Sequence, residues 1–434
     1  MKIEICDINN IIQYCELKGK ITAVSPVNVS NSTAPVVTVK IDNRLYTLNK
    51  TFLLGLTDKQ NSPRFLLYIC DDKILIGRES RFHITGIFCS IKNILYIDNQ
   101  FSKTTEPLID ILLKFEALKT KFNKLYKEYI FNNNNNRVYA SFLSTKQTGH
   151  HLHNELPGFY NLANIIKFKY IFSYTEIFAK HEELFPENTF VRYLTNEEIF
   201  QKICIENITI LKCTVPTIQP SLLYNIKKLK SDKIFFTKKN KCILLTIRLA
   251  KRTLTNQFEF IIENILSLEK LFPNSTYLID GCVQWYNAEM SEQYWSESKE
   301  QTLVNKLKET LPHIDIYSLI GMKVPMYLKY LDSVDFYIAH CHTPQHKIGY
   351  LTNACGVFHG AYNDKPITPR PKEKEIEDHR KTDNIFGVGS KVIHYPQNCF
   401  TYSSLSSQYP APIEYTANIV ECIKFIENYL QDVK

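Results

Sequence analysis

Apolar residues over the first hundred positions fall in short runs bounded by turn-forming residues, a pattern typical of β-strands. The runs are 35–40, 64–70, 73–77, 83–89 and 93–98. From Pro107 to Ile130 the apolar residues recur every three or four positions instead, which predicts one amphipathic helix. The asparagine run 132–136 then favours a flexible boundary. The pattern predicts a β-rich N-terminal unit that includes this helix, residues 1–131.

Beyond residue 137, strand-like and helix-like segments alternate, as in the repeated β-α units of a doubly wound parallel sheet. The continuous apolar run 242–249 is typical of a strand buried on both faces of such a sheet. An apolar stripe predicts a helix over 255–272, with Thr255 as its cap. Other expected helices are 150–166, 175–184, 300–311, 325–331, 345–354 and 415–430.

The chain is therefore expected to be an α/β protein with two Rossmann-like, doubly wound domains facing a cleft, preceded by the β-rich unit. The first domain spans 137–220, the second 240–400, and a C-terminal helix lies within 410–434. Ligands of such sheets bind beyond the carboxyl ends of the strands. Three polar clusters occupy such positions in the sequence.

Composition narrows the class of protein. The length of 434 residues suits two or three domains, and 44% hydrophobic with 22% charged residues excludes a disordered or fibrous chain. The 12 cysteines are spread without a C-x-x-C pair, which argues against a secreted disulfide framework. No signal peptide and no long apolar run occur. We expect a cytoplasmic protein, with peripheral association at the inner face of a membrane as an open alternative.

The net charge of +8 comes from one basic segment. Residues 227–252 contain ten lysines or arginines and one aspartate, so the rest of the chain is close to neutral. This distribution argues against a general nucleic-acid coat. Glycine is scarce, with 13 residues, and neither a P-loop, nor G-x-G-x-x-G, nor Asp-x-Asp occurs. The missing glycine-rich motifs argue against kinase and dinucleotide-binding functions. The missing Asp-x-Asp argues against the metal–diphosphate site that is usual in sugar transferases.

The first cluster follows the expected strand 138–143 at the start of a helix. His151 and Glu155 are four positions apart and share a helix face, so the carboxylate can orient the imidazole as a general base; His153 is a further catalytic candidate. The alternative is a polar helix start at which Asn154 and Glu155 favour the helix dipole. A zinc site is a variant, although the H-E-x-x-H spacing is absent.

The second cluster ends the strand 242–249 with Arg248, Lys251 and Arg252. Cations at a strand end suit a ligand's diphosphate, because arginine bonds two oxygens and lysine adds a point charge. For the lysines before Lys241 we favour a solvated linker or helix edge. Arg248 differs, because an unpaired charge within the apolar strand end would be costly.

The third cluster is His340-Cys341-His342-Thr343-Pro344-Gln345-His346-Lys347, between an expected strand and a helix. A helix N-terminus with Thr343, His346 and Lys347 suits a phosphate. A capped helix with packed histidines is the alternative. Zinc bound by residues of this run and Cys355 ranks lower, because the spacing matches no standard ligand pattern. His359 follows on the next strand, whose neighbouring glycines would let a nucleotide approach the backbone.

Over residues 137–365 the chain resembles bacterial glycosyltransferases of the two-Rossmann type, the GT-B fold, in particular enzymes of capsule and lipopolysaccharide biosynthesis. The motifs are GHHLHNEL at 149–156, the basic turn 248–252, LFPN at 271–274 with IDG at 279–281, and the His346, Lys347, Asn353 pattern. The resemblance implies that His151 or Glu155 is the base and that Arg248, Arg252, His346 and Lys347 bind the donor diphosphate. Its glycine-rich donor loop and paired glutamates are missing here, which leaves donor and stereochemistry open.

The resulting hypothesis is a metal-independent glycosyltransferase that needs no cofactor beyond its nucleotide-sugar donor. Its acceptor is a glycan or lipid-linked glycan of a bacterial surface polysaccharide, and no nucleic acid is bound. The donor-binding residues are Arg248, Lys251, Arg252, Thr343, His346, Lys347 and His359. Two other functions stay open: a zinc-dependent hydrolase using the His/Cys cluster, and a non-catalytic polyanion-binding protein using 227–252.

Overall fold

The fold is taken from a computed structural model of the 434-residue chain. The residues that it describes are 2–6, 38–41, 44–47, 50–54, 65–70, 73–78, 84–89, 94–98, 105–132, 138–143, 151–164, 166–173, 176–191, 194–211, 220–229, 239–249, 253–284, 298–340, 348–349, 351–352, 354–360, 392–402 and 414–433.

The chain divides into two compact units. The first contains 1–175 and 185–219, so the β-rich N-terminal residues and the first parallel sheet share one unit. The second contains 176–184 and 220–434. The short segment 176–184 therefore belongs with the second unit although it lies in the sequence of the first.

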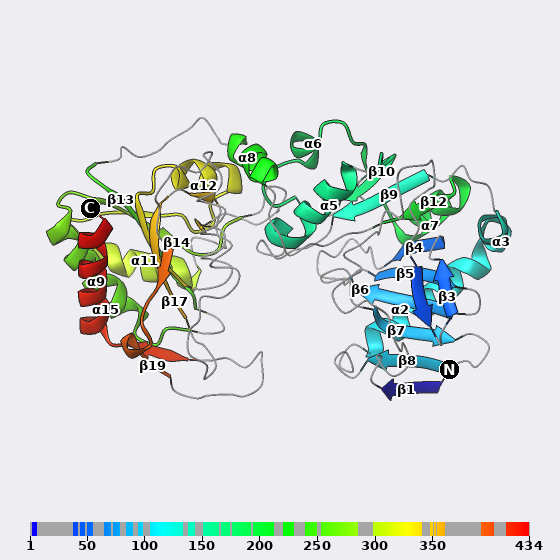
Figure 1. The fold of residues 1–434 in the computed structure, drawn as a ribbon, viewed down its shortest axis with the longest axis horizontal. Helices are drawn as coiled ribbons and strands as arrows, with labels where there is room; N and C mark the ends of the chain where they lie inside the picture. Colours follow the sequence, from blue (N-terminus) through cyan, green and yellow to red (C-terminus); the bar gives the residue numbers. More distant parts are fainter. Residues whose placement is uncertain are drawn as a thin grey trace. The chain divides into compact units, whose positions relative to one another are not determined.

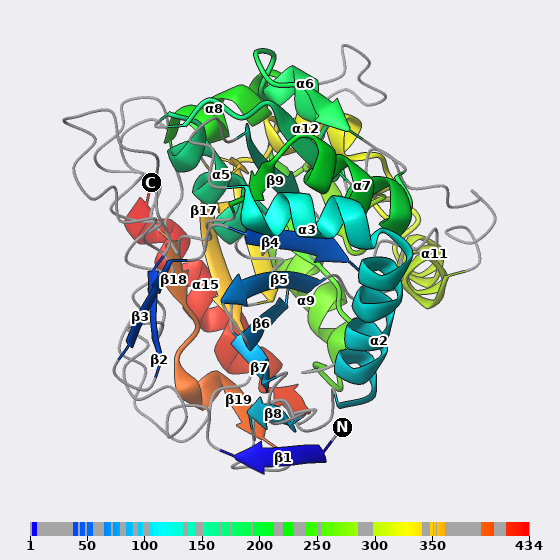
Figure 2. The same cartoon turned by 90° about the vertical axis from the view of Figure 1, so that its right-hand side faces the viewer.

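The N-terminal residues form a six-stranded sheet in the order β1-β8-β7-β6-β5-β4, in which β1 and β8 are parallel and the other neighbours antiparallel. Figure 2 shows these strands following one another down the sheet, with helix α2 alongside. The strands are β1 (Lys2–Cys6), β4 (Lys50–Leu54), β5 (Phe65–Cys70), β6 (Lys73–Arg78), β7 (Ile84–Cys89) and β8 (Ile94–Asp98), with a separate pair β2 (Thr38–Ile41) and β3 (Arg44–Thr47). The prediction of a β-rich unit is confirmed.

The helix expected over 107–130 is two helices, α2 (Thr105–Lys121) and α3 (Asn123–Phe131), separated at Phe122. Their apolar face covers Phe52 of β4, whose ring lies 5.2 Å from that of Phe115. The ring of Phe200, on helix α7 (Asn196–Ile205), lies 4.7 Å from Phe52 on the same cluster. Because α7 lies in the chain between two strands of the first parallel sheet, this aromatic cluster joins the two parts of the first unit.

The junction between β4 and the first parallel sheet also contains buried polar contacts. The Lys50 ammonium donates to the carbonyl oxygen of Tyr129 and, at 3.3 Å, to Asn207 Oδ1. The Tyr129 hydroxyl donates to the Ile208 carbonyl at 2.8 Å, and the backbone N–H of Ile210 donates to Thr51 Oγ1 at 2.6 Å. The N-terminal sheet is therefore joined to the first parallel sheet by hydrogen bonds in which a side chain is the donor or the acceptor.

The first parallel sheet has four strands in the order β11-β10-β9-β12. They are β9 (Val138–Leu143), β10 (Tyr170–Ser173), β11 (Phe190–Val191) and β12 (Ile208–Ile210). The expected helix 150–166 is a five-residue π-helix, η2 (His151–Glu155), continued by α5 (Leu156–Ala163), because Pro157 starts a regular helix at its first turn. The helix expected over 175–184 is only α6 (His181–Leu184).

The second sheet has six parallel strands in the order β15-β14-β13-β16-β17-β18, a doubly wound arrangement. The strands are β13 (Cys242–Thr246), β14 (Thr276–Asp280), β15 (Asp315–Ser318), β16 (Phe336–His340), β17 (Cys355–His359) and β18 (Val392–His394). The helices are α8 (Pro220–Lys228), α9 (Gln257–Leu271), α11 (Lys299–Thr310) and α12 (Val324–Leu331). The expected fold class, α/β with two Rossmann-like domains, is confirmed; the cleft between them stays a prediction.

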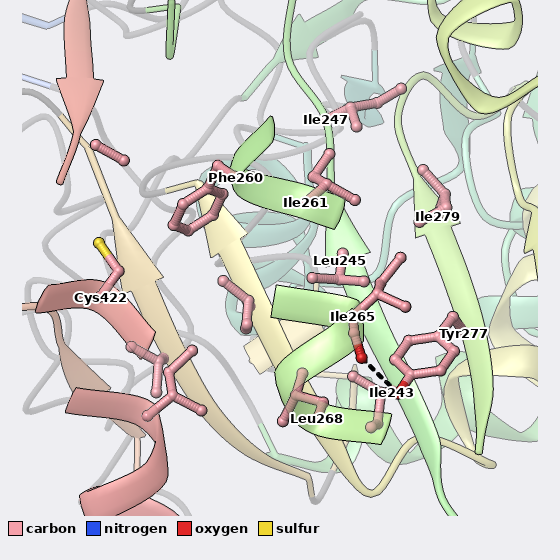
Figure 3. Close-up of a cluster of buried hydrophobic side chains, with 14 of the residues drawn as sticks. Ile243, Leu245, Ile247, Phe260, Ile261, Ile265, Leu268, Tyr277, Ile279 and Cys422 are labelled. Atoms are coloured by element: carbon pink, nitrogen blue, oxygen red, sulfur yellow. Dashed lines mark hydrogen bonds between the residues drawn. The ribbon is translucent and has the colours of Figure 1, made fainter. Parts of the chain in front are cut away.

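The core of the second unit lies between this sheet and its helices. Ile261, Ile265 and Leu268 of α9 lie over β13 and β14, and the hydroxyl of Tyr277 donates to the Ile265 carbonyl (Figure 3). The face of β13 opposite α9 is buried too, since all five residues of the strand are shielded from water. This burial on both faces is what its continuous apolar sequence predicted.

The C-terminal residues complete this core. The segment expected as a helix from Tyr415 begins as a strand, β20 (Tyr415–Ala417), which pairs antiparallel with β19 (Phe400–Tyr402) after a 3-10 turn, η3 (Gln397–Cys399). The helix α15 (Ile419–Val433) follows and packs beside α9 (Figure 1). The amphipathic prediction was right for 419–430 and wrong for 415–417.

Thr255 is not the cap of α9, contrary to the sequence prediction. The N-cap is Asn256, and neither residue's side chain caps the helix amides. Both turn to β20 instead. Within the described residues, no helix has the length and apolar character needed to span a membrane.

Candidate functional site

Four polar side chains mark the carboxyl ends of the central strands of the second sheet. Thr246 ends β13 beside Asp280, which ends β14. His340 ends β16 beside His359, which ends β17. All four are buried, with at most 3% of each residue exposed. The sequence alternative of packed histidines applies to both imidazoles, and their partners decide what each can do.

Thr246 holds His340 from one side. Its backbone N–H donates to Thr246 Oγ1 at 2.8 Å, and its ring Nδ1 lies 3.3 Å from the same oxygen. Thr246 Oγ1 accepts the backbone bond, and in one of the two neutral tautomers of His340 it donates its own proton to Nδ1. The proton of the neutral ring is then on Nε2. This Nε2 is buried and has no hydrogen-bond partner among the described residues.

The charge state of His340 follows from its surroundings. Burial and the neighbouring positive charge of Arg248 lower the pKa of His340 to about 3, although the Thr246 bond acts in the other direction. The ring is therefore neutral near pH 7 and presents one N–H donor. A buried donor without an acceptor is costly, which makes the position receptive to a ligand oxygen.

Gln257 supplies a second buried donor of the same kind. It is the first residue of α9 and only 4% exposed. Its Oε1 accepts from the backbone N–H of Arg248 at 2.8 Å, which fixes the amide orientation, because the reversed amide would place two donors together. Its Nε2 has no partner among the residues that the structure describes.

These donors and Arg248 belong to one region. Arg248 lies two residues beyond β13 and is half-buried, so its charge is outside the strand and not within it as expected from the sequence. Phe260, one turn after Gln257, has its ring 5.1 Å from that of His359, which in turn is 4.3 Å from His340. Two N–H donors, a guanidinium and the positive end of α9 thus share one edge, which suits an anion.

Asp280 places a carboxylate at this edge. The Tyr327 hydroxyl donates to Asp280 Oδ2 at 3.2 Å. Burial and the Asp280 charge raise the pKa of Tyr327, so the phenol remains a donor. In the strand order β14 and β16 are separated by β13, so Asp280 is on the far side of Thr246 from His340. The IDG motif therefore contributes a structural carboxylate.

Gly356 serves packing and not a nucleotide, contrary to the sequence expectation. It pairs with Tyr337 across β17 and β16, and a Cβ at Gly356 would lie 2.1 Å from a carbon of the Tyr337 ring. Gly281 is similar, because a Cβ there would meet the carboxylate of Glu300 at 2.5 Å. At these two positions glycine makes room for a neighbouring side chain.

In the first unit the structure pairs His151 with Glu155. Nδ1 of the imidazole and Oε2 of the carboxylate are 2.7 Å apart, with side chains 0% and 2% exposed. Glu155 therefore holds a histidine and does not cap a helix start. The contact fixes a proton on Nδ1 and leaves Nε2 as the basic nitrogen of the neutral ring. The pairing is observed, and its catalytic role stays a prediction.

Several predicted site residues lie outside what the structure describes. Neither backbone nor side chain is described for Lys251, Arg252, Thr343, His346 and Lys347. For His153 the backbone, in η2, is described but the side chain is not. The helix expected over 345–354 is described only at 348–349, 351–352 and 354. Their assigned roles remain sequence predictions.

The described members of the residue set suggested for zinc do not lie close together. The described residues contain no group of three or more His, Cys, Asp or Glu able to hold a metal ion. Cys355 begins β17 whereas His340 ends β16, so the two lie at opposite ends of paired parallel strands, roughly 13 Å apart along five residues. A tetrahedral zinc site does not include both.

The described cations of the basic segment 227–252 do not all lie together. Lys228 is exposed on α8 and lies 4.1 Å from the Tyr224 ring. Lys239 precedes β13 and pairs with Asp315 at 3.1 Å. Arg248 follows the same strand at its opposite end. Among the described side chains, Lys239 and Arg248 thus lie at opposite ends of β13, and the polyanion-binding alternative stays a prediction for the rest of the segment.

Sequence reasoning missed Gln257 and Tyr415, and it considered His340 as a packed histidine or a zinc ligand but not as a donor to a ligand. Gln257 has a neutral side chain in a helix stripe, which gives no chemical signal. Tyr415 lies in a segment with helical periodicity. The end of the expected strand before 340 was the one available signal for His340, because strand ends are where ligands bind.

Comparisons with known proteins add little. The sequence matches no protein-family model and no curated protein. Among solved structures, a trehalose-6-phosphate synthase studied with bisubstrate glycomimetics is 12% identical, with a TM-score of 0.26 over 62% of this chain and 73% of that one. Apo OtsA is 9% identical, with a TM-score of 0.24 over 67% and 79% of the two chains. S. aureus TarM bound to fondaparinux, α-GlcNAc-glycerol and UDP is 10% identical, with a TM-score of 0.22 over 84% and 64%. At these TM-scores the likenesses carry no argument, and the fold class rests on the strand order.

Proposed function

We propose that this chain is a glycosyltransferase that moves a sugar from a nucleotide-sugar donor to a hydroxyl group of a glycan or lipid-linked glycan in bacterial surface polysaccharide synthesis. One observation carries the proposal: the buried donors His340 Nε2 and Gln257 Nε2 lie beside Arg248 at the carboxyl edge of a Rossmann-like sheet. That edge is where doubly wound sheets bind nucleotides. A diphosphate supplies acceptor oxygens for both donors and a negative charge for Arg248.

The same groups suit the chemical step. When the bond between the sugar's anomeric carbon and the diphosphate oxygen breaks, both bonding electrons leave with the diphosphate, and its negative charge increases. Fixed N–H donors that strengthen their bonds to this charge lower the barrier, because they need no reorganisation. The proposal assigns the same role to Lys251, Arg252, His346, Lys347 and Thr343 as further donor ligands.

The acceptor must lose a proton as its oxygen bonds to the anomeric carbon. In the proposal, Nε2 of His151 takes this proton, and the Glu155 carboxylate on Nδ1 stabilises the imidazolium that forms. No metal is part of the proposed step. The nucleotide-sugar is a substrate, so the proposal includes no separate cofactor.

Binding of nucleotides to single-residue variants tests the donor site. Gln257→Glu keeps the acceptor for the Arg248 N–H and replaces the N–H donor by a carboxylate oxygen. We expect about 100-fold weaker binding of UDP, GDP, ADP or CDP, whichever the wild type binds, because a charge-assisted contact becomes a repulsion. His340→Asn removes one donor, and about tenfold weaker binding is expected.

The matched control is Gln301→Glu on α11. Its Oε1 accepts from Ser318 Oγ at 2.7 Å, so this substitution also retains an acceptor, and β15 is three strands away from β16. Isothermal titration calorimetry should give the wild-type affinity for the control. A Gln257→Glu protein that binds nucleotides as the wild type does would remove the basis of the proposal. Transfer itself is measured as acceptor-dependent release of the nucleoside diphosphate from its sugar.

A further inference from the structure

The C-terminal strand β20 lies against the segment that enters α9. The backbone N–H of Thr255 donates to the Tyr415 carbonyl at 2.8 Å, and the Tyr415 N–H donates to the Thr253 carbonyl at 3.2 Å. Leu254 and Tyr415 form a parallel bridge. The chain is thus joined here over 160 residues of sequence, directly before Gln257.

Asn256 explains why this contact matters for the anion site. Its amide donates to the Ala417 carbonyl at 2.9 Å and accepts from the Ala417 N–H at 2.8 Å. As the N-cap residue it would ordinarily bond the first amides of α9, yet it makes no such bond. The asparagine therefore fixes the start of α9, and with it Gln257, to β20.

The side chain of Tyr415 reaches the other donor. It is fully buried, and its hydroxyl lies 2.9 Å from Nδ1 of His359. The His359 ring lies 4.3 Å from that of His340. Because Thr246 already holds one side of His340, a fixed His359 on its face restricts the remaining freedom of the ring that presents Nε2.

We propose that Tyr415 is a positioning residue of the anion site, acting on His340 through His359 and on Gln257 through the backbone that joins β20 to residues 253–256. This inference rests on the proposed function, because it concerns the same nucleotide-binding edge. It assigns to the C-terminal segment a role in substrate binding besides its packing on the core.

The hydroxyl also sets the tautomer of His359. If the phenol donates to Nδ1, the ring proton of His359 is on Nε2. If the phenol accepts from Nδ1, the ring proton is on Nδ1. In either case the removal of the hydroxyl changes the hydrogen bond on Nδ1. A role in packing alone would not depend on this bond, since the phenylalanine ring fills the same space.

Tyr415→Phe separates the hydroxyl from the ring. The ring keeps its edge-on contact with Phe400, at 5.5 Å, and the backbone bonds of β20 do not involve the side chain. We expect a folded protein, about tenfold weaker binding of the nucleoside diphosphate that the wild type binds, and changed ¹⁵N shifts of the His359 ring in NMR spectra. Asn256→Ala tests the backbone path and should weaken binding by about threefold to tenfold while the His359 shifts stay at their wild-type values.

Tyr277→Phe is the control. It removes a buried hydroxyl from the same core, bonded to Ile265 and Glu269 and not to either histidine. Calorimetry with UDP, GDP, ADP and CDP then distinguishes the outcomes. If Tyr415→Phe binds as tightly as Tyr277→Phe, the positioning role is wrong although the donor site stands. If the wild type binds none of the four, the proposed function itself fails, and the positioning role with it. If Tyr415→Phe does not fold, undiminished binding by Asn256→Ala overturns the role.

Discussion

Each of the two units has a buried histidine, and the two lie in opposite electrostatic settings. His151 lies against the carboxylate of Glu155, at 2.7 Å. His340 lies near the guanidinium of Arg248 and bonds a neutral hydroxyl, that of Thr246. The Glu155 carboxylate accepts a hydrogen bond from Nδ1 of His151, whereas burial and the cationic neighbour keep His340 neutral. The proposed function uses this difference: it assigns proton transfer to His151 and anion binding to His340.

The two sheets also differ in how they are supported. The first has strands as short as the two residues of β11 and is joined to the N-terminal sheet by the buried Lys50 and Tyr129 contacts. The second has six strands and an apolar core closed by α15. A small sheet buries less apolar surface, so the first unit depends more on its polar junction.

Glu155→Gln gives the largest expected effect and tests the first histidine. The amide keeps the shape but not the charge that stabilises an imidazolium, so the turnover number should fall about 100- to 1,000-fold while donor affinity is unchanged. Rates at saturating substrate and thermal unfolding of the same protein check this. A lowered melting temperature with normal turnover of the folded protein would assign the pair to structure alone. Glutamine is preferable to alanine here because His151 and Glu155 are buried, and alanine would leave a cavity beside the imidazole.

Lys50→Met tests the polar junction of the first unit. The substitution leaves the Tyr129 and Asn132 carbonyls and Asn207 Oδ1 without the ammonium that they share, and should cost about 3 kcal/mol of unfolding free energy. Lys114→Met is the control, since its 2.6 Å pair with Asp110 is exposed and should cost less than about 0.5 kcal/mol. Urea unfolding followed by circular dichroism measures both. Equal losses would mean that the junction is not a support.

His340→Asn tests the second histidine through pH. With a pKa near 3 in the folded protein and about 6.5 when unfolded, wild-type His340 binds a proton mainly on unfolding between these values. The unfolding free energy should therefore fall by up to about 1.4 kcal/mol per pH unit as pH decreases from 6.5 toward 3. Above pH 6.5 the contribution of the neutral His340 to stability is complete. The variant should show a flatter profile. His313→Asn, at an exposed position, serves as the control, and parallel profiles for all three proteins would refute the assignment.

The smallest expected effects compare one helix cap from each unit. Thr195 caps α7 in a capping box with Glu198, and Ser298 caps α11 by accepting from the Gln301 N–H. Replacement of either by alanine should cost about 1 kcal/mol. If the units unfold separately, Thr195→Ala lowers one calorimetric transition and Ser298→Ala the other. A shift of both transitions by either variant would contradict independent units.

Much of the fold could be predicted because hydrophobic periodicity is local. Strand β13 was expected from its continuous apolar run, and α9 from its stripe. Local pattern failed where a tertiary partner decided the conformation. Residues 415–417 have helical spacing but form a strand, because the backbone of residues 253–255 and of β19 offers hydrogen bonds. Thr255 has the chemistry of a cap but bonds Thr416 instead.

The sequence by itself determined the class of sheet and the local pairing of His151 with Glu155, because four residues of helix bring these side chains together. Only the tertiary structure decided which polar groups at the second edge are engaged. Thr246 and His340 are 94 residues apart, and His359 and Tyr415 are 56 apart. A hydrogen bond between such distant residues leaves no periodic trace, so the buried donors of His340 and Gln257 are recognised only once their neighbours are in place.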